Sequence, residues 1–279
     1  MLVDKMAQPA IAREFAELYT RLVEGRELNE AQIQQLLRQI NHHSEHKKPY
    51  RVDMPIAEGV TLKDFIVHPN QMDPSRMTSL KYAQFVYASK DLQALYLGAD
   101  SAKRVLSLGC GTGSPGLVFT LSRQGTGLFL PNVLFADISQ DAIENARQNM
   151  LNLKSQYHGI ESRCTFVQSD LFRNIDGQFD LIEFNHPFFP ISRERYDPEN
   201  NYPILRTMLG GDGDILHRFL DEAQGKGPIL MPYYHLLGPT NDPAVQAPKH
   251  GYSVQELHRE INTQGVQQGL ISFYLLKSK

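Results

Sequence analysis

The chain has 279 residues, of which 41% are hydrophobic and 21% are charged. This composition is typical of a globular protein and excludes the disordered and fibrous classes. The 28 basic and 31 acidic residues give a net charge of −3, so a binding surface made by bulk positive charge is not expected.

The cysteines and histidines predict neither a disulfide framework nor a metal site. The two cysteines, Cys110 and Cys164, exclude a disulfide framework and a four-cysteine zinc site. His42, His43 and His46 include two imidazoles four positions apart, the spacing of a helical metal site. No further ligand motif lies nearby, so we expect a solvated helix end there and no metal.

The apolar segments are short throughout the chain. None reaches the roughly 18 residues that a membrane span needs. The N-terminus lacks the apolar stretch of a signal peptide and soon becomes a polar helical pattern. We therefore expect a cytoplasmic protein without a membrane partner.

Residues 1–75 are expected to form a small extension that helps to select the substrate. Apolar residues at helical spacing predict a first helix over residues 11–22. Asn29 and Gln32 have the spacing of a capping box and predict a second helix that continues to residue 40. Short β-like pieces broken by prolines then predict a hairpin or an extended connector over residues 47–74.

Residues 76–279 are expected to form the larger domain. After a helical pattern over residues 75–97, strand-like and helical segments alternate, which predicts an α/β fold with a doubly wound, mostly parallel sheet. The expected strands are residues 104–108, 132–136, 164–168, 179–184 and 228–234, and the expected helices are residues 114–124, 140–154 and 215–224. One more helix over residues 252–264 and a last strand over residues 270–277 complete the prediction, so only one clear strand follows residue 264.

The first strand of this domain runs directly into a glycine-rich loop. The loop consists of Leu108, Gly109, Cys110, Gly111, Thr112 and Gly113. Glycines let a ligand approach the backbone beside the N-terminus of the next helix. Counted from Gly109, the dinucleotide fingerprint needs a third glycine where Ser114 stands. This mismatch argues against a dinucleotide site. We favour an S-adenosylmethionine site at this loop, and a purely structural turn and a dinucleotide site are the alternatives.

The next two strands end in carboxylates. Asp137 and Ile138 follow the second strand, where an acid can accept hydrogen bonds from both ribose hydroxyls of a nucleoside. Asp170 and Leu171 close the third strand, where a carboxylate can accept a hydrogen bond from an adenine amino group. A helix cap near Asp137 and an ordinary loop aspartate at Asp170 are the alternatives.

The fourth strand ends in Asn185-His186-Pro187-Phe188. Here the chain resembles the class I S-adenosylmethionine-dependent methyltransferases, in the amino-methylating branch marked by Asn-Pro-Pro-Tyr/Phe. This branch includes the release-factor glutamine N5-methyltransferases and the ribosomal RNA guanine-N2 methyltransferases. Residues 210–213, Gly-Gly-Asp-Gly ahead of a helix, strengthen the resemblance. It implies a seven-stranded Rossmann-like sheet and S-adenosylmethionine as the cofactor.

The resemblance also implies roles for the four residues of this loop. The side-chain oxygen of Asn185 and the carbonyl of His186 would accept both hydrogens of a planar NH2 group, close to the cofactor. Phe188 would stack on the substrate, and Pro187 keeps His186 extended. Two acceptors placed off the amide plane favour a pyramidal nitrogen and aim its lone pair at the methyl group. Because the sulfonium is the electrophile, no metal is required.

Two positions depart from the family pattern. His186 replaces the first proline of the motif, and Ser107 stands where the family usually has an acid near the amino-acid end of the cofactor. The first departure leaves a general-base role for His186 as an alternative, and the second bears on cofactor affinity. Phe188 could also be simple core at a strand end.

The predicted function is methyl transfer to a planar amino or amide nitrogen of a macromolecule. A glutamine-type side chain of a protein is favoured, and an exocyclic amine of an RNA base is the main alternative. A binding module that has kept the fold and lost catalysis is the alternative from a different class. The sequence leaves the oligomeric state open.

Overall fold

The fold is taken from a computed structural model, which describes residues 28–44, 47–75, 77–121, 127–196, 204, 207–262 and 269–279. The helix expected over residues 11–22 lies outside the described residues. In the described part of the chain, no helix is both long enough and apolar enough to cross a membrane.

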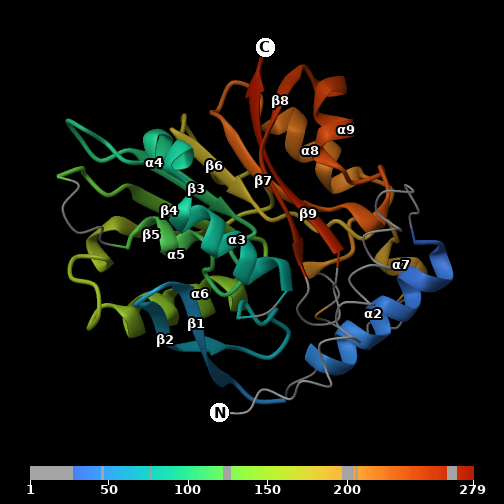
Figure 1. The fold of residues 1–279 in the computed structure, drawn as a ribbon, viewed down its shortest axis with the longest axis horizontal. Helices are drawn as coiled ribbons and strands as arrows, with labels where there is room; N and C mark the ends of the chain where they lie inside the picture. Colours follow the sequence, from blue (N-terminus) through green and yellow to red (C-terminus); the bar gives the residue numbers. More distant parts are fainter. Residues whose placement is uncertain are drawn as a thin grey trace, which may run out of the picture.

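A seven-stranded sheet forms the centre of the molecule, with β5 at one edge and β8 at the other (Figure 1). The strand order is β5-β4-β3-β6-β7-β9-β8. The five strands from β5 to β7 run parallel, whereas β9 is antiparallel to both β7 and β8. The strands are β3 (Arg104–Leu108), β4 (Asn132–Asp137), β5 (Cys164–Gln168), β6 (Leu181–Phe184), β7 (Ile229–Tyr234), β8 (Tyr252–Asn262) and β9 (Gly269–Ser278). The predicted doubly wound, mostly parallel α/β sheet is confirmed.

Helices cover both faces of this sheet, which explains why its central strands are almost continuously apolar. A Cβ on Gly116 would lie 2.6 Å from the Ser107 hydroxyl, so α5 covers the face that carries Ser107. On the other face, the ring of Phe184 lies 4.5 Å from that of Phe219 in α8. The helices are α2 (Glu30–Ser44), α3 (Met77–Ala88), α4 (Lys90–Tyr96), α5 (Gly116–Phe119), α6 (Gln140–Leu153), α7 (Arg193–Tyr196), α8 (Asp214–Glu222) and α9 (Pro243–Gln246).

The C-terminal end corrects one prediction. Residues 252–264 were expected to be helical, but Tyr252–Asn262 is strand β8, which pairs with β9 as an antiparallel hairpin. A β-bulge between Glu256 and His258 inserts one extra residue into β8. Because of the bulge, Val254 and Leu257 both pack against the core although they are three positions apart. Three positions is also close to one turn of a helix, so the sequence imitates a helical stripe. The domain therefore does have the C-terminal hairpin that the sequence left open.

The helix after the glycine loop is shorter than predicted. The pattern suggested residues 114–124, but α5 spans only Gly116–Phe119. The Thr120 hydroxyl donates to the carbonyl of Leu117 at 2.7 Å, which competes with continuation of the backbone ladder.

The predicted capping box of α2 is confirmed. The Asn29 side chain accepts from the backbone N–H of Gln32 at 3.0 Å, and the Gln32 side chain accepts from the N–H of Asn29 at 2.9 Å. At this end of the molecule α2 lies beside α7, and Arg195 forms an ion pair with Glu30 at 2.7 Å (Figure 1).

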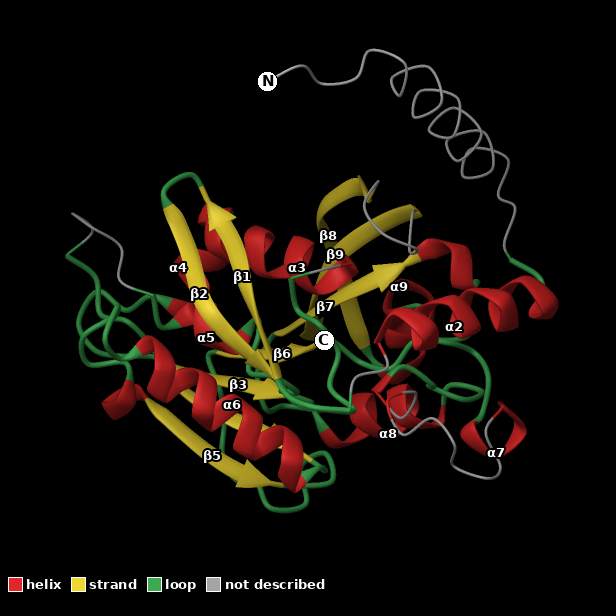
Figure 2. Ribbon diagram, turned by 90° about the horizontal axis from the view of Figure 1, so that it is seen from below, coloured by secondary structure: helices red, strands yellow, loops and turns green. Residues whose placement is uncertain are grey.

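The predicted hairpin consists of β1 (Tyr50–Ala57) and β2 (Val60–Val67). Its second strand, β2, lies against α6 (Figure 2). Three asparagines on α6, which we call the asparagine ladder, bind the backbone of β2. Asn145 and Asn149 both donate to the carbonyl of Ile66, at 2.9 and 2.8 Å, and Asn149 accepts from its N–H at 2.6 Å. Asn152 donates to the carbonyl of Asp64 at 2.9 Å. Side-chain amides thus take the place of a neighbouring strand along β2.

Candidate active site

The glycine loop needs glycine at three positions. Gly109, Gly111 and Gly113 have φ angles of +60°, +52° and +95°, a region that L side chains rarely adopt. A Cβ on Gly109 would lie 3.1 Å from the ring of Phe184, and one on Gly113 would lie 3.1 Å from Leu117. Gly111 has more room, which leaves the backbone accessible at the centre of the loop.

The other loop residues are buried. Leu108 belongs to the core, and the carbonyl of Thr112 accepts a hydrogen bond from Asn149 at 2.9 Å. The backbone N–H of Cys110 donates to the carbonyl of Ala136 at 3.0 Å. Burial raises the pKa of the Cys110 thiol well above its ordinary value, so this cysteine is not a nucleophile.

Asp137 lies at the carboxyl end of β4 and faces the glycine loop. One carboxylate oxygen accepts from the N–H of Gly111 at 3.0 Å, and the other accepts from the N–H of Ser139 at 2.9 Å. Burial raises the pKa of Asp137, and these hydrogen bonds oppose the rise. Ser139 is the residue that caps α6, through the N–H of Ala142. Ile138 is 66% exposed and lies on the surface beside the carboxylate.

The end of β5 is arranged differently. The carboxylate of Asp170 pairs with Arg218 at 3.0 Å, a partner that the sequence did not indicate. Leu171 is buried and has a φ of +47°. An adenine amino group at Asp170 would therefore share the carboxylate with Arg218.

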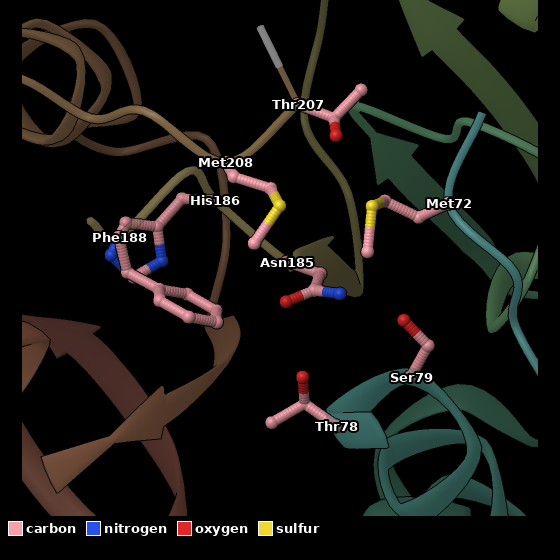
Figure 3. Close-up of a pocket in the computed structure, with 8 residues that line it drawn as sticks. All are labelled: Met72, Thr78, Ser79, Asn185, His186, Phe188, Thr207 and Met208. Carbon is pink, nitrogen blue, oxygen red and sulfur yellow. The ribbon is translucent and has the colours of Figure 1, made fainter. Parts of the chain in front are cut away.

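Asn185, His186 and Phe188 line a small cavity of about 40 Å³ at the end of β6 (Figure 3). The other lining residues are Met72, Thr78, Ser79, Thr207 and Met208. The Oδ1 atom of Asn185 is buried and has no hydrogen-bond partner. A buried amide oxygen of this kind is costly unless a ligand or water supplies a donor. Met72 brings the segment that follows the β1–β2 hairpin into the same cavity.

The structure places the loop and the cavity at one edge of the sheet. Leu108 in β3 pairs in register with Phe184 in β6, so both chains leave the sheet side by side. Parallel strands put their carboxyl ends at the same edge, where ligands of doubly wound folds bind. The glycine loop, Asp137 and Asn185 all follow these strand ends.

Asn241, which was not predicted to be a site residue, contacts the loop of residues 185–188 after β6, which we call the acceptor loop. Its backbone carbonyl accepts from Nε2 of His186 at 2.9 Å, and its side chain donates to the carbonyl of Gly211 at 3.1 Å. A Cβ on Gly210 would lie 2.2 Å from the carbonyl oxygen of Pro187. The Gly-Gly-Asp-Gly turn therefore packs directly on the acceptor loop. No local pattern around Asn241 indicates this contact, because its partners are 30 and 55 positions away.

Glu183 is a second missed residue. It is fully buried in β6, opposite Ser107 in register, and the Ser107 hydroxyl donates to its carboxyl group at 2.8 Å. The backbone N–H of Asn185 and the Tyr82 hydroxyl also bond to it. Burial raises the pKa of Glu183 to about 8. An acid inside the otherwise apolar run of residues 181–184 was the available signal.

Glu183 places a carboxyl group next to Ser107, the residue that departs from the family pattern. The acid that the family carries on the first strand is absent, but a carboxyl group lies on the adjacent strand at the same register. Burial raises the pKa of this carboxyl group, whereas the hydrogen bonds from Ser107, from the N–H of Asn185 and from Tyr82 oppose the rise.

In the described part of the chain, no group of three or more histidine, cysteine, aspartate or glutamate side chains could hold a metal ion. The side chains of His42, His43 and His46 lie outside the described residues. Both cysteines are free.

Comparison with known proteins identifies the family of this chain. Residues 88–199 match the family model of the methyltransferase small domain. A candidate protein N5-glutamine methyltransferase of Methanocaldococcus jannaschii is 30% identical over 170 residues, which cover 59% of this chain and 69% of that protein. The chain belongs to the S-adenosylmethionine-dependent methyltransferases.

Two further relatives of this methyltransferase differ in their substrates. The release factor glutamine methyltransferase of Leptospira interrogans is 34% identical over 46% of this chain and 43% of its own length. Ribosomal RNA large subunit methyltransferase G of Pseudoalteromonas translucida is 35% identical over 32% of this chain and 22% of its own length. The methyltransferase thus spans less than half of either protein.

Proposed function

We propose that this methyltransferase transfers a methyl group to a planar amide nitrogen of a protein side chain of the glutamine type. The observation that carries the proposal is the buried, unpartnered Oδ1 of Asn185 in a cavity at the end of β6, the strand that pairs with the one leading into the glycine loop. An acceptor in that position suits the N–H of an amide, whose conjugated nitrogen needs to be turned out of plane before it can attack.

The residues around the glycine loop fit the cofactor. The accessible backbone at Gly111 suits the amino-acid end, and the carboxylate of Asp137 suits the ribose hydroxyls. When bound, S-adenosylmethionine supplies an electrophilic methyl group on a sulfonium. Asn185 then orients the acceptor nitrogen, and Phe188 packs against the substrate group. The catalytic contribution of these residues is positioning, for which no metal is needed.

The size of the cavity favours a side-chain amide over a nucleic-acid base. A volume of about 40 Å³ has room for only a few water-sized groups, whereas a base would require the loop to open. The net charge of −3 also gives no general attraction to RNA. An RNA base remains the second candidate because one relative is a ribosomal RNA methyltransferase.

We also propose that residues 1–75 help to select the substrate. Met72 lines the cavity, and Gln71 lies close to the glycine loop, 3.6 Å from a Cβ built on Gly111. The segment that follows the β1–β2 hairpin thus borders both the methyl-accepting cavity and the glycine loop.

A methyl-label transfer assay tests the function. The purified enzyme is incubated with labelled S-adenosylmethionine and a lysate, and the protein and RNA fractions are counted separately. We expect label in protein, and Asn185→Ala should lower the rate by about 100-fold while cofactor affinity stays nearly unchanged. Label in RNA alone would select the second candidate, and cofactor binding without any transfer would indicate a binding module.

Calorimetry tests the cofactor site separately. Asp137→Ala removes charge-assisted hydrogen bonds to the ribose and to the N–H of Gly111, so the affinity for S-adenosylmethionine should fall at least tenfold. Asp141→Ala, one turn further at the exposed start of α6, is the matched control and should bind normally. Equal affinities in both variants would place the cofactor elsewhere.

A further inference from the structure

His186 has a fixed tautomer in this structure. Its Nε2 lies 2.9 Å from the backbone carbonyl of Asn241. A carbonyl oxygen only accepts hydrogen bonds, so Nε2 carries the proton and Nδ1 presents a lone pair. The ring is fully buried, which lowers its pKa to about 4 and keeps it neutral at physiological pH.

The Nδ1 lone pair has no partner. The atom is buried and makes no hydrogen bond. Among the residues that line the cavity, two side-chain atoms are buried without a partner, Oδ1 of Asn185 and Nδ1 of His186. Figure 3 shows the imidazole beside Asn185 and Phe188, with one of its nitrogens on that side of the ring. Both unpartnered atoms are acceptors, so the cavity suits a ligand with more than one N–H donor.

Aromatic neighbours hold the imidazole in this orientation. Its ring centroid lies 5.9 Å from that of Phe188 and 6.3 Å from that of Tyr233, which is nearly parallel to it at 17°. Rotation of the ring would break the hydrogen bond to Asn241 and disturb this packing. The lone pair is therefore presented by a rigid group, as a catalytic acceptor must be.

We propose that Nδ1 of His186, in place of the backbone carbonyl that the resemblance implies, accepts a hydrogen bond from the methyl-accepting nitrogen and takes its proton after methyl transfer. The proposal rests on the proposed function, because it concerns the same acceptor site. It gives the imidazole a role that neither a proline nor a backbone carbonyl at this position could have, since neither binds a proton at neutral pH.

The acceptor nitrogen uses its lone pair to form the N–CH3 bond while the S–CH3 bond breaks and its electron pair returns to sulfur. The positive charge thereby moves from sulfur to nitrogen. A formerly conjugated nitrogen with four bonds is a strong acid, so its proton passes to Nδ1 even though the buried imidazole is a weak base. The imidazolium then returns the proton to solvent when the methylated product leaves.

Three substitutions separate this role from a structural one. His186→Gln keeps an N–H near the position of Nε2 for the bond to Asn241 but has no acceptor at the position of Nδ1. His186→Asn can place an oxygen at the position of Nδ1 but cannot take a proton. His186→Pro keeps only the backbone carbonyl and restores the residue found in the family motif.

We expect His186→Gln and His186→Pro to bind S-adenosylmethionine within twofold of wild type but to lose at least tenfold in kcat. His186→Asn should keep the KM for the acceptor substrate near the wild-type value and lose kcat, because it retains the hydrogen bond alone. Wild-type kcat in His186→Gln or His186→Pro would overturn the proposal while leaving the proposed function intact. If wild type itself transfers no methyl group, the proposed function fails first.

A second readout does not depend on activity or on how well the variants fold. In wild-type protein labelled with ¹⁵N-histidine, the resonances of His186 should report a neutral ring with the proton on Nε2 at pH 7. A ring that is charged at pH 7, or protonated on Nδ1, would have no lone pair to offer and would overturn the proposal.

Discussion

Glu183 makes the stability of the fold depend on pH. Its folded-state pKa is about 8, whereas an unfolded glutamate titrates near its ordinary value. Between these values the unfolded chain has released a proton that the folded chain keeps, so the free energy of unfolding should fall as the pH rises. The slope from this one group is at most about 1.4 kcal/mol per pH unit.

Glu183→Gln tests this pH dependence, because it keeps the shape of the side chain and removes its titratable group. Urea unfolding at pH 5, 6.5 and 8 should show a smaller decline in the free energy of unfolding for the variant than for wild type. If the difference between the two proteins is the same at all three pH values, Glu183 does not carry the raised pKa.

Because Ser107 pairs with Glu183, we expect that a carboxyl group on β3 can replace the one on β6. Ser107→Asp alone places two carboxyl groups opposite each other in a buried register and should destabilise the fold by about 3 kcal/mol or more. Adding Glu183→Val removes the second carboxyl group and makes room for the first. The double variant should recover at least half of the loss, as measured by a double-mutant cycle in urea. Additive effects would show that the two side chains do not act as a pair.

At the scale of secondary-structure elements, the turn before α8 supports the acceptor loop. A Cβ on Gly210 would lie 2.2 Å from the carbonyl oxygen of Pro187, whereas one on Gly211 meets no atom within 4 Å. Gly210→Ala should therefore displace the acceptor loop and lower kcat at least tenfold, while S-adenosylmethionine affinity stays within twofold.

The matched control for that turn is Gly211→Ala. Gly211 has a φ of +60°, so alanine should cost about 1 kcal/mol of stability but leave kcat within twofold. Calorimetry for the cofactor and initial rates for methyl transfer measure both variants. Equal losses of kcat would mean that strain in the turn, rather than contact with Pro187, limits the loop.

Local sequence patterns were sufficient to predict several elements of the fold. The glycine loop, the parallel strands and the capping box of α2 all follow from spacing within about ten residues, and the structure has them. β8 was mistaken for a helix because its bulge at residues 256–258 disturbs the period of two. Asn241 and the pair formed by Ser107 and Glu183 could not be predicted, because strand register and long-range contacts place them together.

At the scale of the whole molecule, the asparagine ladder joins the β1–β2 hairpin to α6 and to the glycine loop. Asn149 is fully buried and makes hydrogen bonds to the N–H and carbonyl of Ile66 and to the carbonyl of Thr112 in the glycine loop. Asn149→Ala would remove this partner from the N–H of Ile66 and from the carbonyl of Thr112, while Asn145 still donates to the carbonyl of Ile66. We therefore expect about 2 to 4 kcal/mol of lost stability and weaker cofactor binding.

Asn152→Ala is the control on the same face of α6. Asn152 is partly exposed; its side chain donates to the carbonyls of Lys63 and Asp64 and accepts from Arg51 at 3.5 Å, and water can reach these groups. It should cost about 1 kcal/mol or less and leave cofactor affinity unchanged. Urea unfolding and calorimetry compare the two variants. Similar cofactor affinities in both would indicate that Asn149 does not connect the hairpin to the glycine loop.

The contact of Asn149 with both Ile66 and Thr112 has a thermodynamic consequence for the first part of the chain. Coupling between two sites is reciprocal, so any free energy by which the docked hairpin improves cofactor binding must return as protection of the hairpin when the cofactor binds. The N–H of Ile66, which bonds to a side chain of α6, would then exchange with solvent more slowly in the complex than in the free enzyme. A segment far along the chain from the glycine loop would in this way report on the cofactor's occupancy.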